Sequence, residues 1–212
     1  MPKIKVPRSS PSLDMTPMVD LAFLLVTFFM LTTKFRPDEP VVVDMPSSVS
    51  ETKLPTNIMT VTVDSAGRVF YDIDGQDVRK NLLQKMGDKY KVSFTPTEIE
   101  RFAVMTTFGM PIAQLKGYID ESEDKRKTFN SQTKGIPTDS LKNELADWIN
   151  FGRYAAADDY QAKKQAGKPV KDLRFAIKGD GQANYKIVKK VIDIFQDEKV
   201  NRFNLVTNLK KQ

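Results

Sequence analysis

Apolar and polar positions divide this chain into one long apolar stretch near its start and a larger region of short alternating or periodic segments. From Thr16 to Thr33 the sequence reads TPMVDLAFLLVTFFMLTT, and Asp20 is the one charged residue in it. With the preceding methionine, the stretch would reach roughly 28 Å as a helix, close to the ~30 Å hydrocarbon core of a bilayer. We therefore expect a transmembrane helix over residues 16–33. Thr16 can cap it, and Pro17 suits its first turn, where a missing N–H costs nothing.

The residues before this stretch favour one orientation. Lys3, Lys5 and Arg8 precede it, and this basic bias favours a cytoplasmic N-terminus and a translocated C-terminal domain. Residues 1–15 are thus expected to form a cytoplasmic tail. No small-x-small cleavage pattern follows the apolar run, so it is interpreted as an uncleaved anchor rather than a signal peptide.

Prolines and hydroxyl residues dominate the chain after the apolar stretch. They predict an extended periplasmic linker over residues 34–56. Within it, the segment VVVDM at 41–45 either adds to a sheet edge as a strand or belongs to a solvated tether. A folded periplasmic domain is expected over residues 57–209.

The domain opens with a predicted hairpin. Residues 58–63 and 69–73 alternate and are rich in β-branched side chains, and a turn at 64–67 separates them. Asp77 is expected to cap a helix that runs to about Tyr90. One face of this helix is apolar, formed by Val78, Leu82, Leu83 and Met86.

The end of the chain is equally regular. A strand is predicted at 173–178, a helix from about 185 to 198 and a closing strand at 203–207. Together with the hairpin and its helix, this order predicts an α+β two-layer sandwich with the helices on one sheet face. The final strand–helix–strand unit should be parallel if both strands lie in one sheet.

Residues 91–171 carry helix signals in three places. Thr97 is expected to cap one helix, Pro111 to open a second, and Asp139 or Ser140 to start a third. A polar loop is expected at 128–139. Several residues of the third helix are interpreted as packing residues: Leu145, Trp148, Ile149, Tyr154 and Tyr160.

The composition excludes several kinds of chemistry. The chain contains no cysteine and no histidine, which argues against zinc sites, Ser-His-Asp triads and Cys-His pairs. The net charge of +6 is spread along the chain without a basic stripe, so nucleic acid is not an expected partner. We therefore expect no enzyme activity, no metal and no cofactor.

Asp20 is then the one chemically unusual group. An Asp at the centre of a spanning helix costs ~2.5–3.5 kcal/mol, and such residues usually face a bundle interior or a water path and often relay protons. The alternative is a short side chain that reaches the interface or merely caps the helix. A lone helix cannot hide this carboxylate from lipid, so a partner membrane protein, a second copy of the chain, or both must supply polar surroundings.

Two segments together resemble a known family. LDMTPMVDLAFLLVTFFMLTT is similar to the transmembrane segment of ExbD/TolR proteins, with Thr16, Pro17 and Asp20 in the matching places. The same holds for its exit, formed by Phe28, Phe29, Met30 and Thr32. The closing strand–turn–helix–strand unit and the opening hairpin also resemble that family, so the similarity covers about 1–90 and 172–209.

The resemblance implies a subunit of a bacterial inner-membrane motor. ExbD-like dimers sit inside a pentameric ring of ExbB/TolQ-like subunits, and the proton motive force passed through the membrane Asp drives TonB or TolA. By this match Asp20 carries the proton, with Thr16, Pro17 and Thr27 around it. Thr27 lies near the same helix face, and its hydroxyl is expected to bond to its own backbone.

Residues 91–171 depart from the family pattern as a helical insertion of about 80 residues. The insertion could contact a particular partner, cover a sheet edge or decorate a loop. Two other functions stay open besides the TonB-type motor. One is a non-catalytic single-span periplasmic scaffold in which Asp20 is merely tolerated. The other is a TolR-like or other stator subunit of a related proton-driven machine.

Overall fold

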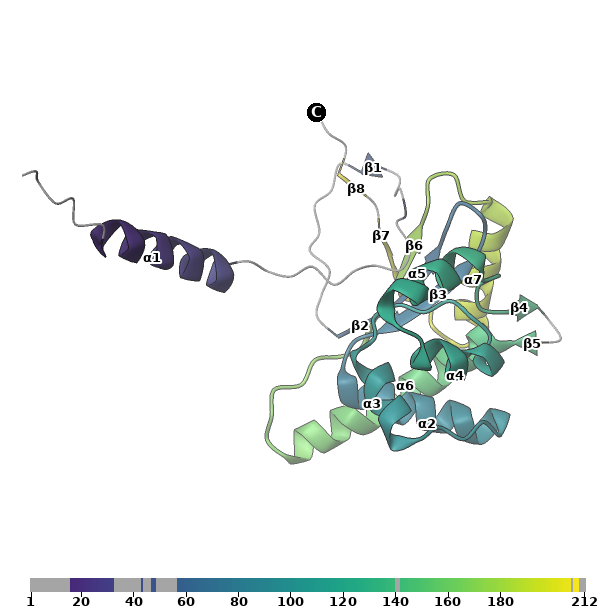
Figure 1. Ribbon diagram of the computed structural model, residues 1–212. Coiled ribbons are helices and arrows are strands. Elements are labelled where there is room, and N and C mark those ends of the chain that lie inside the picture. The colour runs from purple at the N-terminus through teal and green to yellow at the C-terminus, as the bar shows by residue number, and fades with distance from the viewer. Residues whose placement is uncertain are drawn as a thin grey trace, which may run out of the picture. The chain divides into compact units, whose positions relative to one another are not determined.

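The computed structural model describes residues 16–32, 43, 47–48, 57–139, 142–206 and 208–209 (Figure 1). The chain divides into two compact units, Met1–Pro37 and Asp38–Gln212. The described part of the first unit is helix α1 (Thr16–Thr32). The predicted tail at 1–15 lies outside the described residues.

Helix α1 forms where the sequence predicts a helix, and Thr33, the last residue of that prediction, lies outside the described residues. It has 17 residues, which at ~1.5 Å each reach about 26 Å. Among the described residues, none of the helices combines the length and the apolar character that a membrane span requires.

A four-stranded sheet forms the centre of the second unit. Its strands are ordered β3-β2-β6-β7, with β2 antiparallel to β3 and parallel to β6, and β6 parallel to β7. The strand bounds are β2 (Ile58–Val63), β3 (Val69–Ile73), β6 (Arg174–Gly179) and β7 (Asn204–Val206). The predicted hairpin and the predicted parallel unit at the end of the chain are both confirmed.

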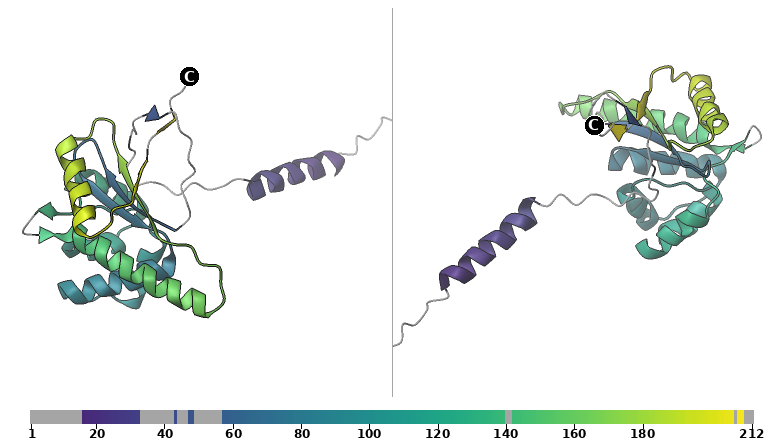
Figure 2. Two further views of the ribbon diagram at one scale, coloured as in Figure 1. Left: turned by 180° about the vertical axis from the view of Figure 1, so that it is seen from behind. Right: turned by 90° about the horizontal axis from the view of Figure 1, so that it is seen from above.

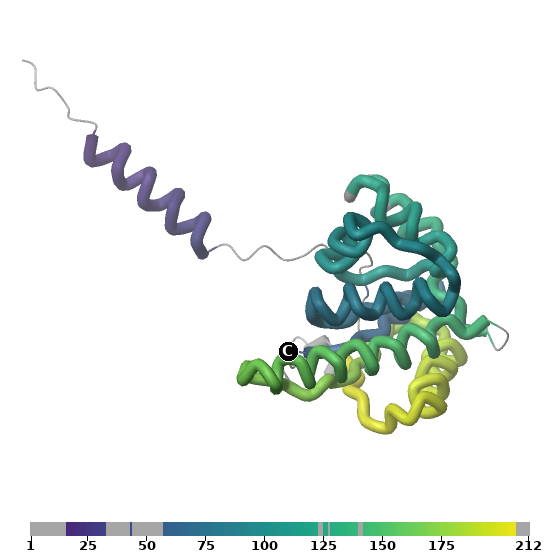
Figure 3. The backbone as a smooth tube through the Cα atoms, turned by 90° about the horizontal axis from the view of Figure 1, so that it is seen from below, coloured from purple at the N-terminus to yellow at the C-terminus, as the bar shows by residue number. Residues whose placement is uncertain are grey.

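Three helices pack on one face of this sheet (Figure 2). Their bounds are α2 (Gln76–Tyr90), α6 (Glu144–Gln165) and α7 (Tyr185–Asp197). Helix α6 lies between α2 and α7 (Figure 3). On the same sheet face, Tyr71 of β3 lies under Gly152 of α6, and Phe175 of β6 contacts Phe195 of α7 with ring centroids 6.2 Å apart. The predicted α+β domain with helices packed on a sheet is confirmed.

Two predicted caps are wrong by two residues. Helix α2 is preceded by Gly75, at φ 98°, while Asp77 lies inside the first turn. Helix α3 (Pro96–Val104) is capped by Thr95 rather than Thr97. The Thr95 hydroxyl accepts from the Glu98 N–H, and the Glu98 carboxylate accepts from the Thr95 N–H, so this reciprocal capping box sets the helix start.

The predicted polar loop at 128–139 is also wrong over its first half. Pro111 precedes α4 (Ile112–Asp120) as expected, but α5 (Glu123–Gln132) follows as a separate helix. The buried Asn130 amide donates to the Tyr118 hydroxyl at 2.9 Å, and the Thr133 hydroxyl donates to the Gly109 carbonyl at 2.9 Å. These internal partners hold the polar side chains inside the fold.

Helix α6 begins later than predicted. Asn143 caps it, accepting from the Ala146 N–H at 3.2 Å, and a short antiparallel pair precedes it. That pair consists of β4 (Thr138–Asp139) and β5 (Lys142–Asn143). Asp139 therefore lies in a strand, and Ser140 lies outside the described residues.

The insertion covers the outer edge of β3. Tyr71 and Phe108 exchange two backbone hydrogen bonds, at 2.8 and 3.1 Å, and the Ile136 N–H donates to the Val69 carbonyl at 2.9 Å. Gly135, at φ 83°, allows this approach, since a Cβ there would lie 2.5 Å from the Val69 nitrogen. Of the three roles considered for the insertion, covering a sheet edge is the one observed.

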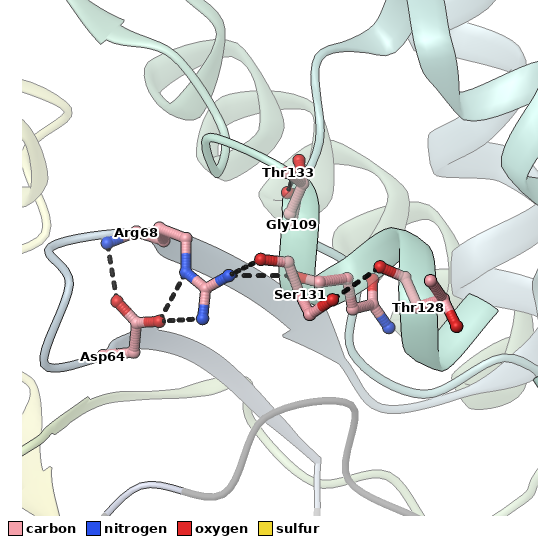
Figure 4. Close-up of polar contacts among 7 residues, drawn as sticks. Asp64, Arg68, Gly109, Thr128, Ser131 and Thr133 are labelled. Atoms are coloured by element: carbon pink, nitrogen blue, oxygen red, sulfur yellow. Dashed lines mark hydrogen bonds and ion pairs between the residues drawn. The ribbon is translucent and has the colours of Figure 1, made fainter. Parts of the chain in front are cut away.

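A partly buried ion pair in the turn of the hairpin also contacts the insertion (Figure 4). An Nη of Arg68 lies 2.6 Å from an Oδ of Asp64, and the Asp64 carboxylate also accepts from the backbone N–H of Arg68 at 2.7 Å. The same guanidinium donates to the carbonyls of Asn130 and Ser131, both at 2.9 Å. Arg68 therefore connects the end of α5 to the β2–β3 turn.

The predicted linker is described at three residues. Ser47–Ser48 form β1, which pairs in parallel with β8 (Asn208–Leu209), and Val43 is only 7% exposed. At 41–45 the strand prediction is tested only at Val43, which is not part of a strand.

Candidate functional site

The candidate site is one side of helix α1. Thr16, Pro17, Asp20 and Phe23 line a hollow on the surface of this helix, together with Val19. The positions i, i+4 and i+7 occupied by 16, 20 and 23 fall on one helical face. The structure thus brings Thr16, Pro17 and Asp20 together on α1.

Thr27 continues this face but its hydroxyl is engaged. It donates to the carbonyls of Phe23 and Leu24, both at 2.9 Å. Thr32 repeats the arrangement, donating to the Phe28 carbonyl at 2.8 Å. The predicted backbone-bonded hydroxyl of Thr27 is confirmed, so Thr27 satisfies its own polar group without help from another chain.

Asp20 has no such internal partner. Among the described residues, no hydrogen bond or ion pair reaches its carboxylate, and every residue of α1 is exposed. Backbone amides of its own helix are occupied by the helical hydrogen bonds beyond the first turn. A carboxylate on an apolar helix therefore needs water or another chain for its stabilisation.

The titratable groups of the folded domain have structural partners instead. The Thr95 N–H holds the pKa of Glu98 below its ordinary value, and Lys116 contributes to the same direction. Burial raises the pKa of Glu144, whose carboxylate accepts from the Ile112 N–H at 2.8 Å at the start of α4. Both carboxylates thus complete helix N-termini.

The same holds where α2 meets α6. The Tyr90 hydroxyl donates to Asp147 at 2.6 Å, and Lys89 pairs with the other oxygen of that carboxylate. Burial and Asp147 together raise the pKa of Tyr90 well above its ordinary value. Among the described residues, no group of three or more acidic side chains could hold a metal ion.

Two of the aromatic residues predicted to pack in the core, Tyr154 and Tyr160, are not fully buried. Leu145, Trp148 and Ile149 are fully buried, as predicted. Tyr154 is 56% exposed, and with the half-buried Tyr160 it lines a cavity beside α6. The exposure of Tyr154 agrees with the helical period, because the buried face of α6 includes positions 148, 152, 155 and 156.

Comparison with known proteins decides the family. The family model for the biopolymer transport protein ExbD/TolR matches residues 7–210, nearly the whole chain. The chain belongs to the ExbD/TolR family. No curated protein and no solved structure matches it.

Membership of the ExbD/TolR family identifies the protein as a non-catalytic transport component. Family membership implies a role in a proton-driven motor for biopolymer transport. The partners that it implies are ExbB/TolQ and TonB/TolA proteins. Members of the family are typically anchored in the inner membrane. The match runs through the insertion as well as through the segments whose resemblance the sequence indicates.

Proposed function

We propose that this ExbD/TolR-family protein is the proton-channel and force-transducing subunit of a TonB-type motor. In this proposal it couples the proton motive force across the bacterial inner membrane to transport across the outer membrane. Asp20 carries the proton. The observation that supports this most is the Asp20 carboxylate itself, which has no partner among the described residues and lies on an otherwise apolar helix.

In this proposal α1 is the part of the chain within the membrane. Its length of about 26 Å is shorter than the ~30 Å core, and such a mismatch is accommodated by local thinning or by side chains that reach the interface. The N-terminus is cytoplasmic and the domain is periplasmic. Flotation of the full chain with liposomes, before and after alkaline carbonate washing, tests the anchor, and release by carbonate would contradict it.

The polar surroundings of Asp20 come from other chains. The proposed arrangement is a dimer of this protein within a pentameric ExbB/TolQ-like ring, with a TonB/TolA-like transducer on the periplasmic side. Moving one charge through a 100 mV potential supplies ~2.3 kcal/mol, which is enough to bias a rotation or rocking step. Thr16 and Pro17 fix the start of the helix, and Thr27 serves only its own backbone.

Asp20→Asn tests the proposal because it keeps size and polarity but cannot titrate. We expect loss of energised uptake with unchanged amounts of protein in the membrane. Thr27→Val is the matched control on the same face, since its hydroxyl bonds only to its own helix. Normal uptake by the Asp20→Asn variant would leave a scaffold role instead. Copurification of a multi-span partner and its transducer then identifies the particular motor.

A further inference from the structure

Helix α6 and the chain that enters β6 line an open cavity of about 410 Å³. This volume lies within the ~300–1,000 Å³ of ordinary ligand pockets. One wall comes from the insertion, through Arg153, Tyr154 and Tyr160, and the other from Leu173 and Phe175. The cavity therefore exists because the insertion lies beside the strand that follows it.

The apolar part of the cavity is aromatic. Tyr154 and Phe175 line it from opposite elements, and Tyr160 lies further along α6. Tyr154 leaves 56% of its surface exposed although its ring offers a large contact area. Aromatic faces favour flat ring systems, which stack or meet them edge to face.

The cationic side chain of Arg153 lines the same cavity in a fixed orientation. One Nη of Arg153 donates to the carbonyl of Glu198 at the end of α7, at 2.5 Å. A guanidinium has five N–H donors in a rigid fork, so this contact orients the group and leaves other donors available. Asn57, whose amide donates to the Lys171 carbonyl at 2.6 Å, is likewise held at the cavity wall.

The charge balance favours an anion. Arg153 and Lys171 line the cavity with one acidic residue, Asp172. An adjoining hollow shares Asp172 and adds Arg174 and Arg202. The cavity itself therefore carries one more basic than acidic side chain.

We propose that this cavity is a binding site for a small carboxylate that carries a flat ring. The ring lies between Tyr154 and Phe175, and the carboxylate accepts from the guanidinium of Arg153. A cage of tyrosines and phenylalanine also suits organic cations, but the excess of basic side chains disfavours them here. The site is independent of Asp20 and of proton coupling.

The test is calorimetric titration of the full chain in detergent with 2-naphthoate, using micelles without protein as the blank. Two matched probes accompany it, the uncharged 2-naphthalenemethanol and the cationic 2-naphthylmethylamine. We expect saturable one-to-one binding of the carboxylate, at least about tenfold tighter than either matched probe, since a charge-assisted hydrogen bond is lost in both. This comparison requires no variant to fold.

Variants then locate the site. Tyr154→Ala and Arg153→Gln should each weaken naphthoate binding by about tenfold or more. Tyr185→Ala, at a tyrosine that is 75% exposed and lines neither hollow, should leave binding unchanged. Equal binding of all three probes, tighter binding of the amine, or undiminished binding to Tyr154→Ala would each overturn the proposal, as would no binding at all.

Discussion

Helix α6 crosses the hairpin so closely that Gly152 has no room for a side chain. A Cβ at this position would lie 2.2 Å from the Tyr71 hydroxyl oxygen and 2.7 Å from the terminal methyl of Met59. Tyr71 is 0% exposed, and its ring packs against Phe108 and Trp148 at centroid distances of 5.8 and 6.0 Å. Its hydroxyl therefore cannot turn aside to admit a methyl group.

Two opposing terms decide the effect of Gly152→Ala. Replacing a helical glycine by alanine stabilises a helix by ~1 kcal/mol. Forcing a methyl group into a packed core costs ~1–3 kcal/mol. The net expectation is a destabilisation of up to about 2 kcal/mol, or a fall in Tm of about 2–4 °C for each kcal/mol in a protein of this size.

Tyr71→Phe should remove most of the cost of Gly152→Ala. The change removes the atom nearest to the new methyl group, and no described residue offers that hydroxyl a hydrogen-bond partner. An unsatisfied buried hydroxyl costs ~1–3 kcal/mol, so Tyr71→Phe alone should be neutral or stabilising. In that background the terminal methyl of Met59 still lies 2.7 Å from the new Cβ, but it is the end of a flexible side chain. Gly152→Ala should therefore cost clearly less beside Phe at position 71 than beside Tyr71, and at best gain ~1 kcal/mol.

The measurement is thermal unfolding of the full chain followed by circular dichroism, with the four proteins forming a double-mutant cycle. Gly117→Ala in α4 is the matched control, because the Cβ that alanine adds there would have no described atom of a neighbouring residue within 4 Å, and it should raise the stability by ~1 kcal/mol. The reasoning fails if Gly152→Ala stabilises the protein as Gly117→Ala does, or if its cost persists beside Phe at position 71.

Three further changes test other contacts by the same unfolding measurement. Asp64→Asn should cost about 1–3 kcal/mol, since it removes the charged partner of the partly buried Arg68, whereas Asp120→Asn in an exposed pair should change stability by less than about 0.5 kcal/mol. Glu98 has a lowered pKa, so its ionised form stabilises the fold above its ordinary pKa, and that contribution is lost as the pH falls through the lowered value. Glu98→Gln should therefore be less stable than the unchanged protein at pH 7, and the gap should close in acid. Asn143→Ala should cost ~1 kcal/mol through the lost cap of α6, and an unchanged Tm would contradict that role.

Local patterns predict most of the sheet. The hairpin is set by alternation and by the Asp64 to Gly67 turn, where Gly67 takes φ 79°, and both signals lie within a few residues of each other. The closing helix α7 is set by its apolar face in the same way, and its start and end agree with the prediction within one residue. The α+β architecture follows from these elements and their order.

Helix starts are less readable because neighbouring residues compete for the cap. Thr95 and Thr97 flank Pro96, and both are good cap residues by type. Both are also followed three residues later by a glutamate, Glu98 or Glu100, so both fit the pattern of a capping box. The structure forms the box at Thr95 and Glu98, where Pro96 occupies the first helical position. The local signal that favours Thr95 is therefore the proline that follows it, and not the spacing from threonine to glutamate.

Contacts between distant segments leave no comparable sequence signal. Phe108 pairs with Tyr71 of β3 as an isolated β-bridge. The sequence pattern around these two residues does not predict this pairing. The same is true of Tyr154, whose exposure depends on where α6 lies over the sheet. These positions are determined by packing, and periodicity alone cannot assign them.

The covered edge of β3 gives the insertion a physical role beyond decoration. Without residues 108 and 136, the outward backbone groups of Val69 and Tyr71 would lose three hydrogen bonds. An unpaired strand edge invites pairing with another chain, and native proteins cover such edges or blunt them. Arg68 adds a second attachment, since its guanidinium joins the same hairpin to the end of α5. The insertion is therefore part of the folded core of the domain, and removing it should destabilise the hairpin as well as expose its edge.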